Sequence, residues 1–143
     1  MDEPTVAQAT LSSAEMAERS VVRETEAIRA IWKVLRTVDF AAGYRLIVAA
    51  AQRYAVETHN FFPRVQSDPG STGYPVDPSR LPHQDTTPDE EASALGRLAK
   101  ILNPMTHGER RRALEFVSWH FAELPAFQAL MARERERGKG RVY

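Results

Sequence analysis

Apolar residues recur at helical spacing along most of this 143-residue chain, and start signals divide the pattern into separate helices. Thr87 and Glu90 have the spacing of a capping box, in which a hydroxyl and a carboxylate satisfy free amides at a helix start. Thr106 and Glu109 repeat that spacing, and Asp39 is a good cap for another helix. We therefore predict an all-α fold. The expected helices cover residues 13–38, 40–57, 88–102, 107–121 and 125–137.

Proline and glycine separate these helices into two groups. Residues 60–87 hold five of the nine prolines, and proline removes the amide donor that helices need. Ser12 and Glu15 have capping-box spacing, so we expect residues before them to be disordered, and Gly138 should end the last helix. The expected organisation is a disordered segment 1–12, a helical hairpin 13–59, a Pro/Gly-rich linker 60–87, a second hairpin with a C-terminal helix 88–137, and a tail 138–143. Two such hairpins resemble a four-helix bundle with an extra C-terminal helix.

The two predicted hairpins align with each other. Residues 27–55 match residues 94–122 without a gap at an offset of 67, and apolar positions such as Ile31 and Leu98 correspond. The alignment indicates an internal duplication, although a shared helical period alone also produces matching apolar positions. Further matched pairs are Lys33/Lys100, Leu35/Leu102, Asp39/Thr106, Arg45/Arg112 and Ile47/Leu114.

One hairpin carries a recognisable pattern. Leu98–Phe121 combines spaced leucines, a short capped turn and the run Glu-Arg-Arg-Arg-Ala-Leu-Glu-Phe-Val-Ser-Trp-His-Phe from residue 109. It resembles a helical hairpin of uncharacterised small proteins from phages and bacterial mobile elements, and that resemblance implies no activity. The first copy departs from the pattern, because Ala42-Gly43-Tyr44 stands where the second copy has Glu109-Arg110-Arg111.

Nothing in the chain suggests catalysis or cofactor binding. There is no cysteine, which excludes a disulfide, a thiolate zinc site and a cysteine nucleophile. There is no phosphate-binding loop, no Gly-x-Ser-x-Gly motif and no His-Glu-x-x-His motif. The four histidines lack metal-ligand spacing. We therefore expect a non-enzymatic protein with no catalytic residues, no metal and no cofactor.

The chain also lacks the signals of export or membrane insertion. Its acidic start, Met1-Asp2-Glu3-Pro4, is unlike a signal peptide, and no apolar stretch approaches the ~18 residues of a membrane span. We expect a cytoplasmic protein that does not enter a membrane.

Protein binding is the preferred functional hypothesis. Lys and Arg balance Asp and Glu at 19 each, so little charge repulsion opposes self-association. The long first helix also offers more apolar surface than one short partner helix can cover. We expect an adaptor, a homodimer or a phage-type modulator of another protein. Aromatic residues are typical contact anchors, and the candidates are Trp32, Phe61, Phe62 and Tyr74.

A nucleic-acid-associated regulator is the alternative hypothesis. Basic residues outnumber acidic ones ten to five over residues 92–143, and clustered arginines can contact phosphates. Three arginines also lie in the first turns of the fourth helix, where they oppose the helix dipole. The candidate phosphate contacts are Arg110, Arg111, Arg112, Arg133 and Arg137.

Overall fold

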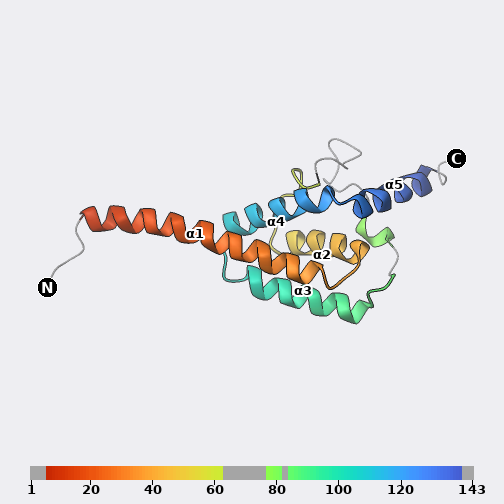
Figure 1. Cartoon of the computed structure of the whole chain (residues 1–143), viewed down its shortest axis with the longest axis horizontal. Coiled ribbons are helices and arrows are strands. Elements are labelled where there is room, and N and C mark those ends of the chain that lie inside the picture. The colour runs from red at the N-terminus through yellow and green to blue at the C-terminus, as the bar shows by residue number, and fades with distance from the viewer. Residues whose placement is uncertain (1–5, 63–76, 82–83, 140–143) are drawn as a thin grey trace.

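The computed structural model describes residues 6–62, 77–81 and 84–139, with the side chains of residues 6–12, 135 and 137–139 outside that description. The predicted all-α fold is confirmed, because the described part contains five α-helices and no strand (Figure 1). The elements are α1 Val6–Leu35, α2 Phe40–Arg53, the 3-10 turn η1 Pro78–Arg80, α3 Pro88–Leu102, α4 His107–Ala122 and α5 Pro125–Lys139.

Three predicted helix caps form as the sequence indicates. The Asp39 carboxylate accepts a hydrogen bond from the Ala42 amide at 2.8 Å and starts α2. Capping boxes join Thr87 with Glu90 at the start of α3 and Thr106 with Glu109 at the start of α4. The helix starts at residues 40, 88 and 107 are therefore set by local hydrogen bonds.

Helix α1 extends further toward the N-terminus than predicted. It begins at Val6, so residues 12–15 lie inside the helix and the prediction of disorder is wrong for residues 6–12. No glycine or proline interrupts residues 6–35, and alanine and glutamate there favour the helix strongly enough to override the capping spacing. The N-terminal half of α1 projects beyond the other helices (Figure 1), and its Met16, Val21 and Val22 side chains are exposed.

Two helices end where the sequence gives no clear signal. Helix α2 stops at Arg53 rather than near residue 57, because Ala55 adopts a left-handed backbone conformation with φ of 53°. That conformation usually calls for glycine, so the stop is invisible in the sequence. Helix α5 continues through Gly138 to Lys139, so the predicted end at residue 137 is also wrong. Glycine weakens a helix without always ending it.

The helices pack mainly across the two halves of the chain, and not as two separate hairpins. Helix α1 packs against α4 and α3, and α2 packs against α3, α5 and α4. The consecutive pairs α1/α2 and α3/α4 are not among the principal packed pairs of the described part. The halves therefore share one core, and α5 extends it beyond α4 (Figure 1).

The 67-residue offset reappears in the structure. Helices α1 and α3 end at residues 35 and 102, and α2 and α4 begin at residues 40 and 107. Burial follows the same offset, since Ile31 and Leu98 are both buried, as are Ile47 and Leu114. Matching bounds and matching burial give the sequence alignment a structural counterpart.

Two ion pairs also obey this offset, and they cross between the halves. Arg45 of α2 pairs with Glu91 of α3 at 2.7 Å, and Arg112 of α4 pairs with Glu24 of α1 at 2.6 Å. Arg45 and Arg112 are 67 residues apart, as are Glu24 and Glu91. Such reciprocal contacts are what a two-fold relation between equivalent surfaces produces. The two halves thus pack like two subunits of a small dimer joined in one chain.

Glu109 adds a further connection between α1 and the start of α4. Its Oε2 atom accepts hydrogen bonds from Ser20 Oγ at 2.6 Å and from Arg23 Nη2 at 3.0 Å, and its Oε1 atom accepts from the Thr106 amide. The bonds from Ser20 and Thr106 outweigh the effect of burial and, with Arg23, lower the pKa of Glu109 to about 2.

The two reciprocal ion pairs should differ in their contribution to stability. The Arg45 side chain is 11% exposed, whereas the Arg112 side chain is 52% exposed. We expect Arg45→Ala to lower the free energy of unfolding by about 2–3 kcal/mol, because it leaves Glu91 largely buried without that cation. Arg112→Ala should cost less, about 1 kcal/mol, because water screens the half-exposed Arg112 guanidinium, although its partner Glu24 is only 14% exposed. Urea denaturation measures both, and equal losses would contradict this ranking.

Protonation of Glu109 should make the stability of the protein fall at low pH. Its folded-state pKa of about 2 lies below the ordinary 4.5, so its stabilising effect is complete above pH 4.5 and is lost as pH falls from 4.5 to about 2. Glu109→Gln keeps an acceptor for Thr106 but removes the charge. We expect the substitution to lower the free energy of unfolding by about 2 kcal/mol at pH 7. It should also make that free energy fall less steeply as pH drops below 4.5. The free energy of unfolding of the original protein and of Glu109→Gln is measured at pH 7, 4.5 and 3. The same dependence of that free energy on pH in both proteins would refute the prediction.

Candidate functional site

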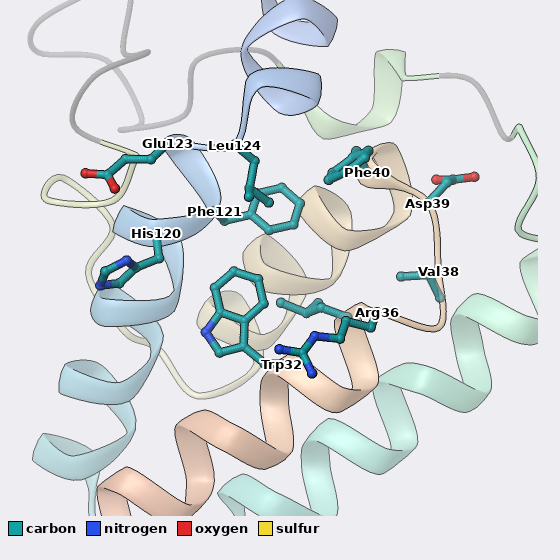
Figure 2. A pocket seen from close by; sticks show the side chains of 10 residues that line it. Trp32, Arg36, Val38, Asp39, Phe40, His120, Phe121, Glu123 and Leu124 are labelled. Atoms are coloured by element: carbon teal, nitrogen blue, oxygen red, sulfur yellow. The ribbon is translucent and has the colours of Figure 1, made fainter.

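A groove of about 800 Å³ lies where α1 ends, α2 begins and α4 ends (Figure 2). Its size is within the range of known small-molecule and side-chain binding pockets. Apolar side chains provide most of its wall, with Trp32 from α1, Phe40 from α2 and Phe121 from α4 among them. Leu124, which follows α4, closes one side.

The aromatic rings of the groove contact one another. Trp32 and Phe121 stack at 21° with their centroids 6.2 Å apart, and Phe40 lies tilted against Phe121 at 6.1 Å. Phe121 is itself buried and packs edge-on against Phe127 of the core at 4.8 Å. Phe40 is 41% exposed. The floor of the groove is therefore rigid core, and its rim presents apolar surface to solvent, as contact sites do.

Polar groups at the rim differ in their availability. Burial alone would raise the pKa of Asp39, but hydrogen bonds from the amides of Ala42, Thr86 and Asp85 hold that pKa below its ordinary value. Both Asp39 carboxylate oxygens are thus committed to backbone amides. Arg36 beside Trp32 is exposed, whereas Glu123 lies on the α4 side of the groove and takes part in another contact (Figure 2).

The two halves differ at the corner beside the groove. In the second half, Arg110 donates to the carbonyl oxygens of Leu102 and Asn103 at 2.8 and 2.9 Å, and its guanidinium covers the Tyr54 ring at 4.5 Å. The residue 67 positions earlier is Gly43, which has no side chain to make the equivalent contacts.

The corner of the first half is built around that glycine. Phe121 occupies the position equivalent to Tyr54, and a Cβ atom on Gly43 would lie 2.9 Å from Phe121 Cζ. The phenyl ring therefore lies directly against the α2 backbone, beside Leu35 and Arg36 of the groove. The close approach requires glycine at this position.

The structure separates the four aromatic residues predicted to bind a partner. Trp32 lines the groove. Phe61 and Phe62 are fully buried and pack in the core with Tyr44 and Phe127, so neither is exposed as a contact anchor would have to be. The reason is that apolar residues beginning a linker gain more by covering the helices beside them than by facing water. Tyr74 lies outside the described residues.

The four predicted phosphate contacts whose side chains the structure describes do not form one patch. Arg110 binds the carbonyl oxygens at the end of α3, and Arg112 pairs with Glu24. Arg111 lies in the first turns of α4 and Arg133 in the second half of α5, and both are exposed. Figure 1 shows the start of α4 and the end of α5 at opposite ends of these successive helices. The side chain of Arg137 lies outside the described part. Intramolecular contacts therefore account for two of the three α4 arginines.

Several groove residues were not identified from the sequence. Phe40 and Leu124 look like ordinary core positions in the helical pattern, and the contribution of Gly43 depends on a ring from a helix far along the chain. One usable signal was present. Residues 27–38 contain Arg29, Lys33 and Arg36 and no acidic residue, which marks the end of α1 as locally basic.

No protein-family model, curated protein or solved structure matches this chain. The resemblance to phage and mobile-element hairpins therefore stays a prediction. Among the described residues, no three histidine, aspartate or glutamate side chains gather as a metal site would require. No helix in that part of the chain is long and apolar enough to cross a membrane.

Two glycine substitutions should have opposite effects. Gly43→Ala places a methyl group 2.9 Å from Phe121 Cζ, so we expect it to displace the ring and to cost about 1–3 kcal/mol of unfolding free energy. Gly96→Ala, in α3, meets no atom within 4 Å and should stabilise the protein by about 0.5–1 kcal/mol through helix propensity. Thermal unfolding of both variants tests the close contact, and a neutral Gly43→Ala would show that the ring moves freely.

Proposed function

We propose that this chain is a non-enzymatic protein-binding module whose contact site is the groove formed by Trp32, Phe40, Phe121 and Leu124. The observation that carries the proposal is an apolar groove of about 800 Å³ with partly exposed aromatic rings at its rim. Aromatic side chains in a concave surface are typical anchors of protein interfaces. An adaptor or modulator role, including the phage-type role suggested by the resemblance, is compatible with such a site.

The groove is suited to binding because it needs little rearrangement. Phe121 is held between Trp32, Phe40 and Phe127, so the floor exists before a partner arrives. A preformed site loses less conformational entropy on binding than a flexible one. Side chains at the rim remain exposed and would be covered by a partner.

The nucleic-acid alternative has weaker support. It depended on a continuous patch of arginines, and Arg110 and Arg112 are engaged within the chain. Each phosphate contact needs a cation that can neutralise the phosphate and so release the counterions condensed on the nucleic acid, and an arginine already engaged within the chain contributes less to such binding. Arg111 and Arg133 alone are a small electrostatic surface.

Site-specific photo-crosslinking in cells that express the chain tests the proposed contact site. A benzoyl-phenylalanine at position 40 should yield a discrete covalent adduct with another protein, because Phe40 lies at the rim of the groove. The same probe at position 111 or 133 is the matched control on an exposed surface outside the groove. An adduct of equal yield at the control positions, or none at position 40, would argue against the groove as the contact site.

A further inference from the structure

The end of α1 carries a basic stripe directly beside the groove. Arg29, Lys33 and Arg36 are spaced by four and three residues, which places them on one side of the helix, next to Trp32. All three side chains are exposed. Within the described part of the chain they have neither ion-pair nor hydrogen-bond partners, in contrast to Arg45 and Arg112. This basic stripe therefore offers positive charge that the fold itself does not use.

The acidic groups near the groove do not neutralise the stripe by direct contact. Asp39 uses both carboxylate oxygens on backbone amides, and Glu123 lies across the groove on the α4 side (Figure 2). Arg36 belongs to both features, because it lines the groove and ends the stripe. An apolar cavity and available cations are thus continuous on one surface.

We propose that the groove binds an acidic amphipathic segment of a partner protein. An apolar side chain of that segment enters between Trp32, Phe121 and Leu124, and its carboxylates pair with the basic stripe. This inference rests on the proposed function and adds the chemistry of the partner. Complementary charge around an apolar anchor supplies specificity and speeds association.

The spacing of the stripe defines what fits. Arg29 lies on α1, and Arg36 directly follows the helix with its amide still bonded to the Trp32 carbonyl. Their separation of seven residues corresponds to about 10 Å along the helix axis. A helical partner with acidic residues at i, i+4 and i+7 presents its charges over the same length. An apolar residue on the adjacent side of that helix would then face the groove.

An apolar groove next to a basic stripe favours a protein segment over a nucleic acid as the ligand. A phosphate backbone could contact three cations, but it offers no apolar side chain to fill a cavity of about 800 Å³. A helix with one acidic and one apolar side satisfies both parts of the surface at once.

Selection from a random peptide display library on the full chain tests the partner chemistry without assuming a sequence. We expect selected peptides to combine leucine, isoleucine or an aromatic residue with several acidic residues. Their binding should be lost on Phe40→Ala, which removes an exposed rim side chain. Circular dichroism of that variant checks that the helices are intact.

A synthetic helical peptide then measures the contribution of charge. It carries glutamates at i, i+4 and i+7 beside a leucine pair, and matched peptides replace the glutamates by glutamine or lysine, or the leucines by alanine. We expect each replacement to weaken binding about tenfold or more at low salt. The protein variant Arg29→Gln/Lys33→Gln/Arg36→Gln should lose as much affinity. The control Lys100→Gln/Arg111→Gln/Arg133→Gln removes equal charge elsewhere and should stay within about twofold.

Each other outcome overturns the proposal in a distinct way. If selected peptides need Phe40 but are neutral or basic, the acidic partner is wrong and the proposed function stands. If no selected peptide depends on the groove, both the acidic partner and the proposed function are wrong. If a DNA or RNA oligonucleotide competes through the same three cations, the occupant is a nucleic acid. If sedimentation shows a dimer that the triple Gln variant dissociates, the occupant is a second copy of this chain.

Discussion

The packing of each helix against helices of the other half is the constraint on which the rest of the structure depends. The reciprocal pairs Arg45–Glu91 and Glu24–Arg112 lie at equivalent places in that packing. Sliding α2 along α3 would separate a guanidinium and a carboxylate that are both largely buried, which is far more costly than losing an exposed pair. Apolar burial supplies the attraction between the halves, and these pairs fix their register.

The equivalence between the halves makes their difference at one corner informative. A guanidinium and an aromatic ring fill one corner, where Arg110 covers Tyr54. In the other corner Gly43 lets the Phe121 ring lie against the α2 backbone, and that ring also forms part of the groove wall.

Helix α1 connects the structural and the proposed functional features. It contributes Trp32 to the groove, Glu24 to a cross-half ion pair, and Ser20 and Arg23 to the buried Glu109 carboxylate. Hydrogen bonds and ion pairs on its inner side fix the helix against α4. Its outer side therefore carries basic side chains that no other part of the described chain engages. A rigid support of this kind is what positions an interaction surface.

Local rules allowed much of the fold to be derived from the sequence alone. Helical spacing, three caps and the 67-residue repeat are short-range patterns, and each predicts a feature that the structure contains. Tertiary structure decided the rest, because pairing across the halves, the burial of Phe61 and Phe62, and the corner at Gly43 depend on residues far apart in the chain. Of the three predicted contact residues that the structure describes, only Trp32 lines the groove, since a helical pattern identifies an apolar face but not the partner that covers it.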